Sequence, residues 1–316
     1  MKAKIKGFIT TREAAAKWSI SAQRVGQLCA DGRVFGARRD GTHWLVPSDA
    51  PRPSDGRANK NCPPELRELV FRVDALKRDL ESLCPLTDGE KRRLSESFLV
   101  DYTHNSTAIE GNTLTLSETA IVLGGVTIAQ KSLKEHLEVI GHRDAFRYLE
   151  AATKANEAVS EKFVRELHSL VLADSPEDKG VWRRISVMIV GAVHTPSQPY
   201  LIPKLMEDWV REVNSSREHA VVLAAKSHLT FEAIHPFIDG NGRTGRLVAN
   251  FIMMRRGFLP VSIKYDNRLA YYSAFTAYHE RGDYVPMAKI FLEAECARLE
   301  EYLAIIRGGE PAEVTK

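Results

Sequence analysis

The chain has 316 residues, of which 44% are hydrophobic and 27% charged, so it holds enough apolar material for one large globular unit or two smaller ones. It contains no apolar run as long as a membrane span and no stretch typical of a signal peptide, so we expect no membrane partner. The cysteines form no CxxC pair and no Cys/His cluster, which argues against zinc and a disulfide framework and leads us to expect a cytoplasmic protein.

The formal net charge is only +3, but it is distributed unevenly along the chain. Residues 1–46 carry nine Lys and Arg residues against three acidic ones, which gives +6 and leaves −3 for the remainder. A basic head on a slightly acidic body indicates an anionic partner for the head.

The first predicted elements are two short helices followed by a turn. Thr10 and Glu13 have the spacing of a capping box and predict the start of one helix, and Ser21 predicts the cap of a second. Gly32 ends the second helix, and the Asp40-Gly41 pair predicts a turn between two extended segments.

This order of helix, turn, helix and small β-wing resembles the excisionase/MerR-like winged helix-turn-helix family, on the stretches "TTREAAAKWSIS", "RVGQLCADGRV" and "HWLVP". The resemblance implies a DNA-binding accessory domain over residues 1–46. The helix residues that would face a DNA groove are Gln23, Arg24 and Gln27, and the wing residues that would meet phosphates are Arg38 and Arg39. The alternative is a docking or dimerisation module, so a second copy of the chain is also a candidate partner.

Residues 47–64, "PSDAPRPSDGRANKNCPP", contain five prolines and predict an extended linker. Residues 307–316 predict a frayed tail. Between these segments apolar residues recur at helical spacing in many places, namely 66–83, 131–153, 160–172, 204–213, 219–234, 244–256, 269–279 and 284–306. The exception is 183–203, whose β-branched run and Pro-rich turn predict a β-hairpin. We therefore expect a mainly α fold with one β-hairpin.

Polar residues and glycines are concentrated in "IHPFIDGNGRTGRLV", residues 234–248, between two apolar helices. Pro236 disfavours helical geometry at His235, so we expect the first helix to end there with the imidazole at its tip. The glycines permit a sharp turn, and the N-terminus of the next helix offers unpaired N–H groups to an anion.

The side chains of this junction fit a phosphate site. Arg243 and Arg246 lie three residues apart and can point at one anion. Asp239 offers an oxygen ligand of the kind that Mg²⁺ takes together with phosphate oxygens, and His235 can accept a proton near neutral pH. The sequence predicts a polyphosphate and Mg²⁺ beside a general base, without the P-loop pattern. The alternative is a structural turn with a capping Asp and exposed arginines.

The stretch "HPFIDGNGRTGR" matches the motif HxFx(D/E)GNGRxxR at every defined position and resembles the Fic family, over about residues 65–300. The resemblance implies a protein adenylyltransferase, which transfers AMP from ATP to a Ser, Thr or Tyr hydroxyl of a target protein and releases pyrophosphate. His235 would deprotonate the hydroxyl, Phe237 would pack inward and fix the loop, and Asp239 would hold Mg²⁺.

The same resemblance implies how the phosphates of ATP are bound. Gly240, Asn241 and Gly242 would line the anion hole. Arg243 would bind the β-phosphate, and Arg246 would bind the γ-phosphate. Positioning and neutralisation of charge would then supply most of the acceleration.

Upstream, "DYTHNSTAIEGN" contains Ser106 and Glu110 one helical turn apart, within residues 102–112. Beside the motif above, this stretch resembles the inhibitory motif (S/T)xxxE(G/N) of Fic proteins. The resemblance implies that Glu110 pairs with Arg246, so that ATP binds unproductively, and that Ser106 points toward the phosphates. In some relatives of this kind the same glutamate positions water to remove AMP.

Two further segments resemble parts of Fic proteins. The hairpin at 183–203 would be the flap, whose edge binds the target backbone as an added strand. The stretch "RLAYYSAFTAYHERGD" would form the adenine pocket, with Tyr272 and His279 in it. The alternative is that the hairpin merely caps the helices and that the aromatic residues belong to the core.

The sequence thus predicts N-terminal helices at 65–130 and a catalytic core at 131–306. We expect a Mg²⁺-dependent, self-inhibited protein adenylyltransferase with an accessory head. The alternatives are a Fic relative that transfers another phosphate-containing group or removes AMP, and a DNA-binding regulator whose core only senses a nucleotide.

Overall fold

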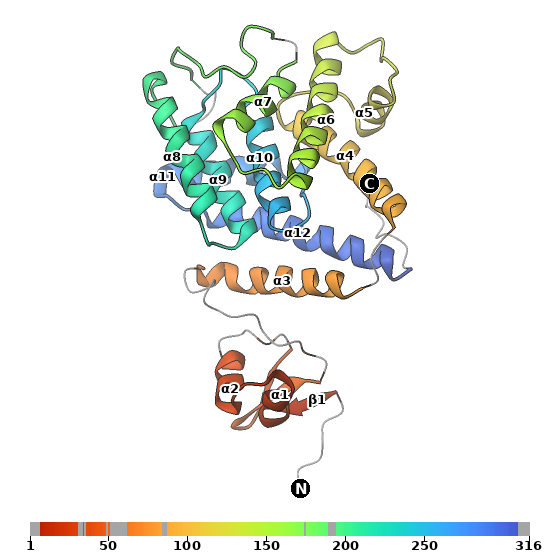
Figure 1. Ribbon diagram of the computed structural model, residues 1–316, viewed down its shortest axis with the longest axis vertical. Coiled ribbons are helices and arrows are strands. Elements are labelled where there is room, and N and C mark those ends of the chain that lie inside the picture. Colours follow the sequence, from red (N-terminus) through yellow and green to blue (C-terminus); the bar gives the residue numbers. More distant parts are fainter. Residues whose placement is uncertain are drawn as a thin grey trace. The chain divides into compact units, whose positions relative to one another are not determined.

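The computed structural model describes residues 7–30, 34, 36–48, 50, 62–83, 87–173, 175–188 and 194–308. The chain divides into two compact units, Met1–Phe71 and Arg72–Lys316 (Figure 1). Most of the predicted linker and of the predicted tail lies outside the described residues. No helix in the described ranges is both long enough and apolar enough to cross a membrane.

The N-terminal unit combines two helices with a small antiparallel sheet, drawn in red in Figure 1. Its elements are β1 (Phe8–Thr10), α1 (Thr11–Trp18), α2 (Ala22–Ala30), β2 (Arg38–Asp40) and β3 (His43–Pro47), and the strand order is β1-β3-β2. The predicted caps are confirmed, since Thr10 and Glu13 form a capping box and Ser21 Oγ accepts from the backbone N–H of Arg24 at 3.1 Å. Trp18 and Val25 lie in the core of this unit.

The rest of the described chain is helical, which confirms the predicted mainly α fold. Its helices are α3 (Arg67–Ser82), α4 (Asp88–Ile109), α5 (Leu116–Leu123), α6 (Leu133–Lys154), α7 (Glu161–Val171), α8 (Ile202–Ser215), α9 (Ala220–Ile234), α10 (Asn241–Arg255), α11 (Arg268–Arg281) and α12 (Val285–Ile306). Short 3₁₀ turns lie at Pro64–Leu66, Pro199–Leu201 and Tyr265–Asn267.

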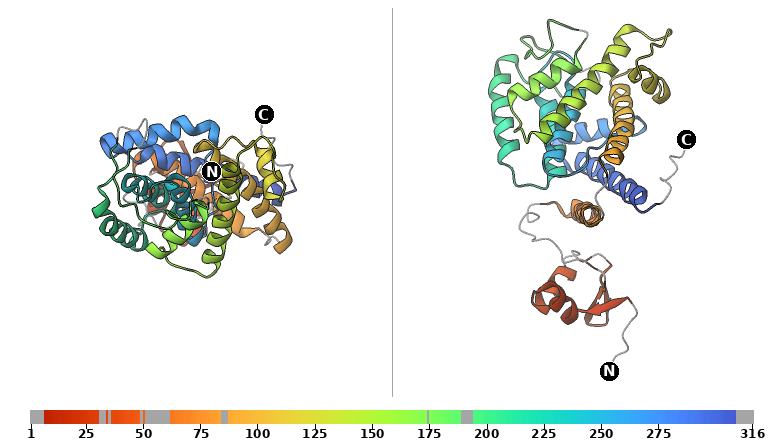
Figure 2. Two further views of the ribbon diagram at one scale, coloured as in Figure 1. Left: turned by 90° about the horizontal axis from the view of Figure 1, so that it is seen from above. Right: turned by 45° about the vertical axis from the view of Figure 1, so that its right-hand side comes forward.

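Helix α10 lies in the middle of the larger unit, and nearly all of its residues are buried. It packs against α9, α6 and α7, and α9 packs in turn against α12 and α8 (Figures 1 and 2). A helix that is buried nearly all round must be surrounded by other elements. The loop between α9 and α10 is therefore held between two of the best-packed helices of the protein.

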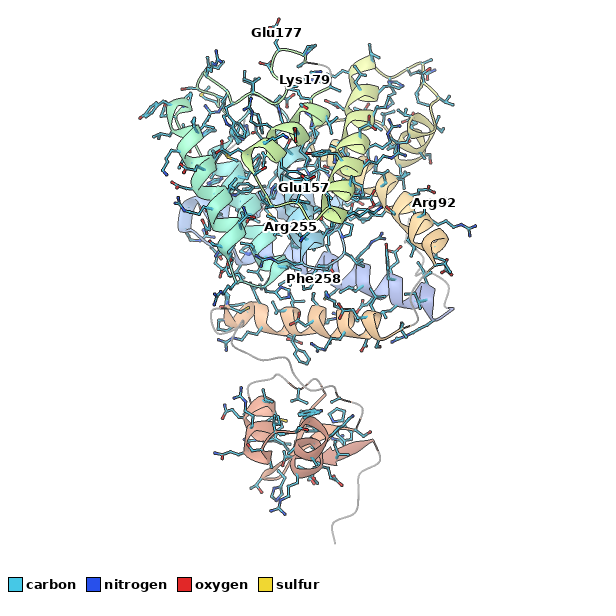
Figure 3. All side chains as sticks on the ribbon, in the orientation of Figure 1. Arg92, Glu157, Glu177, Lys179, Arg255 and Phe258 are labelled. Carbon is cyan, nitrogen blue, oxygen red and sulfur yellow. The ribbon has the colours of Figure 1, made fainter. Side chains whose placement is uncertain are left out.

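Residues of α3 that belong to the larger unit are bound to it by polar contacts. Asp74 lies 3.2 Å from Nε2 of His219, and Arg72 pairs with Glu300 at 2.6 Å. The ammonium group of Lys77 lies 5.3 Å from the ring centre of Phe258, which is labelled in Figure 3.

The β-hairpin predicted at 183–203 does not appear as paired strands in the residues of this segment that the structure describes, 183–188 and 194–203. Residues 189–193, at its predicted turn, lie outside the description, and the legs on either side form no strand. The guanidinium of Arg183 donates to the carbonyls of Ile185 and Ser197, one on each leg. In a β-hairpin these carbonyls would accept from backbone N–H groups of the opposite strand. Here they accept from the side chain of Arg183, which connects the two described legs without a β-ladder.

Two helix predictions also change. Helix α10 begins at Asn241 and not at 244, so Arg243 lies in its first turn and Arg246 in its second. Helices α4 and α5 were not placed by hydrophobic periodicity, because the first half of α4 is strongly polar. Capping boxes at Thr87 and Thr115 precede both helices and were the signal that could have located them.

Candidate active site

The loop between α9 and α10 turns as its sequence predicts. Helix α9 ends at Ile234, and His235 adopts a left-handed backbone with φ 51° and ψ 62°. Gly240 precedes α10 with φ 75°, a conformation that glycine adopts without steric cost. The imidazole therefore lies at the tip of one helix, and the N–H groups of the next helix face the same loop.

Phe237 and Asn241 fix the shape of the loop. The side-chain oxygen of Asn241 accepts from the backbone N–H of Phe237 at 2.9 Å, and its amide donates back to the carbonyl of Phe237 at 2.9 Å. The ring of Phe237 is fully buried and stacks on His168 with 3.5 Å between ring centres. The side chain of Asn241 is thus occupied, which leaves its backbone N–H for the predicted anion hole.

His168 on α7 was missed by sequence reasoning, because a lone histidine on an apolar helix gives no signal of a role. Its Nδ1 accepts from the N–H of Gly180 at 2.8 Å, so Nε2 carries the proton and donates to the carbonyl of Asp239 at 2.9 Å. Burial lowers the pKa of His168 to about 4, which keeps the ring neutral near pH 7. Through this hydrogen bond and its stacking on Phe237, His168 fixes the middle of the loop from a different helix.

Gly242 carries the predicted anion site, and an anionic group of the chain itself already lies there. A Cβ atom added to Gly242 would overlap Oε1 of Glu110. Glu110 is the residue that follows the last turn of α4, so that helix delivers its carboxylate to the N-terminus of α10. The absence of a side chain at 242 is what permits this approach.

Arg246 is buried and fully engaged, as its predicted pairing with Glu110 requires. Its Nη2 lies 2.8 Å from Oε1 of Glu110 and 2.7 Å from the carbonyl of Ser106. Its Nε donates to the hydroxyl of Ser106 at 3.0 Å, and its Nη1 to the hydroxyl of Tyr271 at 3.1 Å. The hydroxyl of Ser106 therefore orients the guanidinium, and Tyr271 is a contact that sequence reasoning missed.

Arg243 is equally buried but incompletely paired. Its Nη1 lies 3.4 Å from a carboxylate oxygen of Glu138, and its Nη2 lies 3.3 Å from Oδ1 of Asp239. Nε and Nη1 have no hydrogen-bond acceptor among the residues that the structure describes. Asp239 is half exposed, and its Oδ1 also accepts from the N–H of Gly240 at 2.5 Å. The open donors of a buried cation indicate a place for a further anion.

The imidazole of His235 is largely buried, with 16% of its side chain exposed. Its Nδ1 lies 3.5 Å from Oε2 of Glu232. The carbonyl of His235 accepts from Nε of Arg183 at 2.7 Å, and the N–H of Arg183 donates to the carbonyl of Pro236 at 2.9 Å. The first leg of the predicted flap is thus bound to the residues around the candidate base.

The two predicted adenine-pocket residues lie on α11 in different surroundings. The hydroxyl of Tyr272 donates to the carbonyl of Ile109 at 2.8 Å, beside Glu110, and 46% of this residue is exposed. The ring of His279 stacks on His194 of the second leg with 3.9 Å between centres. Burial, with a smaller effect of His194, lowers the pKa of His279 to about 4. The structure does not bring Tyr272 and His279 into contact with each other.

No group of three or more His, Cys, Asp or Glu side chains that could hold a metal occurs in the described part of the chain. Asp239 belongs to no such group and lies beside Arg243 at the N-terminus of α10. Chemically, this arrangement can bind a polyanion and, with His235, accept a proton beside it.

The comparisons with known proteins agree with this geometry. A family model described as Fic/DOC family matches residues 158–253. The solved structure of Fic-1 from C. elegans is 30% identical, with a TM-score of 0.69, over 77% of this chain and 73% of that one. The chain belongs to the Fic family. A Fic domain containing signaling protein from Bacteroides thetaiotaomicron has a TM-score of 0.70 at 26% identity, over 76% of this chain and 99% of that one.

Curated relatives carry a name for the activity. "Protein adenylyltransferase Fic" of Drosophila melanogaster is 33% identical over 80% of this Fic chain and 53% of its own length. The protein of the same name from Nematostella vectensis is 33% identical over 75% of this chain and 56% of its own length. The chain thus spans about half the length of the curated relatives it matches.

Proposed function

We propose that this Fic protein transfers AMP from ATP to a hydroxyl side chain of a target protein. The observation that carries the proposal is the carboxylate of Glu110, which lies on Gly242 and pairs with Arg246 at 2.8 Å. An anion held by a helix N-terminus and a buried arginine occupies the place where the terminal phosphate of ATP would bind. The name that the curated relatives share supports the same activity.

The residues present fit ATP and Mg²⁺. Arg243 is buried with two nitrogens that lack an acceptor, which suits the β-phosphate. Asp239 is half exposed beside it and can hold Mg²⁺ together with phosphate oxygens, as this cation prefers. Bound there, Mg²⁺ would neutralise part of the charge that develops on the leaving pyrophosphate.

In the proposed reaction the target oxygen forms a bond to the α-phosphorus of ATP, and the bond to the bridging oxygen breaks. His235 takes the proton of the hydroxyl. Arg243 and Arg246 hold the β- and γ-phosphates, and the backbone N–H groups of Asn241 and Gly242 hold the departing charge. Gly240 lines the same anion hole, and its N–H is bound to Asp239. The loop that carries these groups is fixed in advance by its buried contacts, so positioning costs little when ATP binds.

Glu110 gives the proposal its regulation. Because its carboxylate pairs with Arg246, this arginine is not available to bind the γ-phosphate, and the γ-phosphate would also be repelled by the negative charge of the carboxylate. We therefore propose that the free protein is self-inhibited. Removal of AMP from a target is the alternative use of the same carboxylate. Transfer of another phosphate-containing group is a further alternative, which the unaltered Asp239 and GNGRxxR residues disfavour.

The test is transfer of label from α-labelled ATP to proteins of a lysate, read by autoradiography and by mass spectrometry of the modified residue. Glu110→Gly should label targets, and Glu110→Gly with His235→Ala should not, because removal of a general base costs about 10²–10⁴-fold. The double variant should still bind ATP. Equal labelling by both variants would exclude His235 as the base.

A second function is favoured by the N-terminal unit. Helix α2 exposes Gln23, Arg24 and Gln27, and β2 exposes Arg38 and Arg39. We propose that this surface binds DNA through phosphates, in a protein of the cytoplasm; a docking or dimerisation role is the alternative. If the docking role holds, residues 1–46 would bring the enzyme to a protein partner. The proposed AMP transfer would be the same in either case.

A further inference from the structure

Glu232 is a carboxylate beside His235 to which the proposed reaction gives no role. It lies on the last turn of α9, and 13% of its side chain is exposed. Its Oε2 lies 3.5 Å from Nδ1 of His235, and that nitrogen has no hydrogen-bond partner among the described residues. The described residues also provide no Lys or Arg within ion-pair distance of Glu232. The imidazole is therefore the nearest group that can compensate this buried carboxylate.

The second oxygen of Glu232 faces a gap that a glycine creates. Oε1 is buried and has no hydrogen-bond partner in the described part of the chain. A Cβ atom at Gly245 would lie 3.0 Å from this oxygen and 2.7 Å from Nδ1 of His228. Both atoms thus point into the space that a side chain at 245 would fill. Gly245 is outside the defined positions of the HxFx(D/E)GNGRxxR motif, and the structure explains why the residue is small.

The hydrogen bonds around His228 fix where its proton lies. Arg246 can only donate, so the hydroxyl of Tyr271 accepts from Nη1 and directs its own proton to Nε2 of His228 at 2.6 Å. Burial, with a smaller effect of Arg246, lowers the pKa of His228 to about 3, so the ring is neutral. A neutral imidazole that accepts at Nε2 carries its proton on Nδ1, and this atom lies with Oε1 of Glu232 around the space at Gly245.

We propose that Glu232 is a positioning residue that keeps the proton of the neutral His235 on Nδ1 and so leaves Nε2 to take the proton of the target hydroxyl. The proposal rests on the AMP transfer proposed above. The distance of 3.5 Å exceeds that of a good hydrogen bond, but contacts of catalytic groups commonly shorten when the substrate binds. When Nε2 gains its proton, the carboxylate also stabilises the imidazolium, as the acidic member of a catalytic triad does.

The first experiment needs no enzymatic activity. The ¹⁵N chemical shifts of the full-length chain, labelled at histidine, report which ring nitrogen of His235 carries the proton in the neutral form. We expect Nδ1–H in the wild-type protein and in Glu232→Gln, whose side-chain oxygen can still accept. In Glu232→Ala the Nε2–H form should gain population, since that form prevails in water. A wild-type His235 protonated on Nε2, or the same tautomer in Glu232→Ala, would overturn the proposal.

The second experiment separates positioning from ATP binding. In the Glu110→Gly background, the single-turnover rate of self-labelling at saturating ATP should fall about 10–100-fold in Glu232→Ala, as for other supporting residues of this kind. The half-saturating ATP concentration should stay within about twofold, because Glu232 touches no residue assigned to the phosphates. Glu232→Gln should recover most of the rate. Loss of ATP affinity at an unchanged maximal rate would contradict the assignment.

A matched control is Glu218→Gln. Glu218 precedes α9 and pairs with Lys226 of that helix at 2.8 Å, away from the loop, so its loss should leave the rate unchanged. The two experiments also separate the two proposals. If Glu110→Gly transfers no AMP under any condition, the proposed function fails, and the tautomer of His235 still decides the role of Glu232.

Discussion

The two buried arginines of the site differ in how completely the chain pairs them. Every nitrogen of Arg246 has an acceptor, from Ser106, Tyr271 and Glu110. Arg243 keeps two nitrogens without one. A buried donor without an acceptor costs free energy. Binding of an anion to Arg243 would therefore satisfy open donors, whereas binding of an anion to Arg246 would have to displace existing hydrogen bonds. The carboxylate of Glu110 shares Nη2 of Arg246 with the carbonyl of Ser106 and adds a negative charge that an incoming phosphate would meet.

This contrast gives the first prediction. Glu110→Gly should raise self-labelling and target labelling sharply, because it frees the guanidinium of Arg246 and removes a like charge from the γ-phosphate. Arg246→Ala should not activate the enzyme, since it removes the side chain that binds the γ-phosphate together with the inhibitory pairing to Glu110. The double variant should be as inactive as Arg246→Ala, because the two residues act through one contact. An unchanged rate in Glu110→Gly would remove the switch and leave the catalytic assignment standing.

The second prediction concerns His168 and stability. Its pKa is lowered by burial to about 4, whereas in the unfolded chain it lies near 6.5. Between these values the unfolded chain binds the proton and the folded one does not, so stability falls as pH falls from about 6.5 to about 4. His168→Gln should therefore lower the dependence of the unfolding free energy on pH, by about 1.4 kcal/mol per pH unit near pH 5.

Urea unfolding at pH 7 and at several values near pH 5 measures this. Because Gln cannot stack on Phe237, the variant should also be less stable than wild type at pH 7. His43 is exposed in the small N-terminal unit, so His43→Gln provides the control and should leave the slope unchanged. A slope that is the same in wild type and His168→Gln would mean that His168 is protonated in the folded protein.

At the scale of elements, sequence reasoning worked where backbone chemistry is local. Pro236 and the glycines predicted the break between α9 and α10, and the structure has it at those residues. The pairing of Glu110 with Arg246 was predicted only through the resemblance to Fic proteins, because nothing in the spacing of Ser106 and Glu110 reveals a partner far along the chain. His168 and Tyr271 were missed for the same reason, since tertiary contacts leave no periodic trace.

The flap is the element where a local rule failed. A β-branched run and a Pro-rich turn predicted a hairpin, but in the described residues one carbonyl of each leg binds the guanidinium of Arg183 instead. This side chain also reaches the carbonyl of His235, so one arginine joins the flap to the catalytic loop. A side-chain bond of this kind has no sequence pattern, and it replaces the ladder that the pattern predicts.

Arg183 therefore gives the third prediction. Arg183→Lys retains the charge but offers one ammonium group in place of a planar fork, so it cannot bind all these carbonyls at once. In the Glu110→Gly background, target labelling should fall while ATP binding remains, and limited proteolysis should cut the flap sooner. Arg184→Lys, at the neighbouring exposed position, is the matched control and should change neither. Equal proteolysis of both variants would show that Arg183 does not hold the flap.

At the scale of the whole molecule, the candidate active site lies in the larger unit and the basic surface lies in the N-terminal unit. The family model matches residues 158–253, inside the larger unit, and the relationship to Fic proteins says nothing about the head. The excess of positive charge lies in residues 1–46, which contain nine basic and three acidic residues. A basic unit joined to a slightly acidic remainder of the chain is suited to bind a polyanion.

The last prediction tests this role on the full-length chain. If the head binds DNA through phosphates, affinity for genomic fragments should fall steeply as salt rises, because each neutralised phosphate releases a counterion. Arg38→Ala combined with Arg39→Ala should weaken binding to all sequences and lower the slope of log K against log salt by about two. Arg92 on α4 is 75% exposed on its side chain and serves as control, since Arg92→Ala removes a surface charge of the other unit. Binding without salt dependence, or an equal effect of Arg92→Ala, would favour a protein-docking head, and a concentration-dependent mass in sedimentation would then identify a second copy of the chain as its partner.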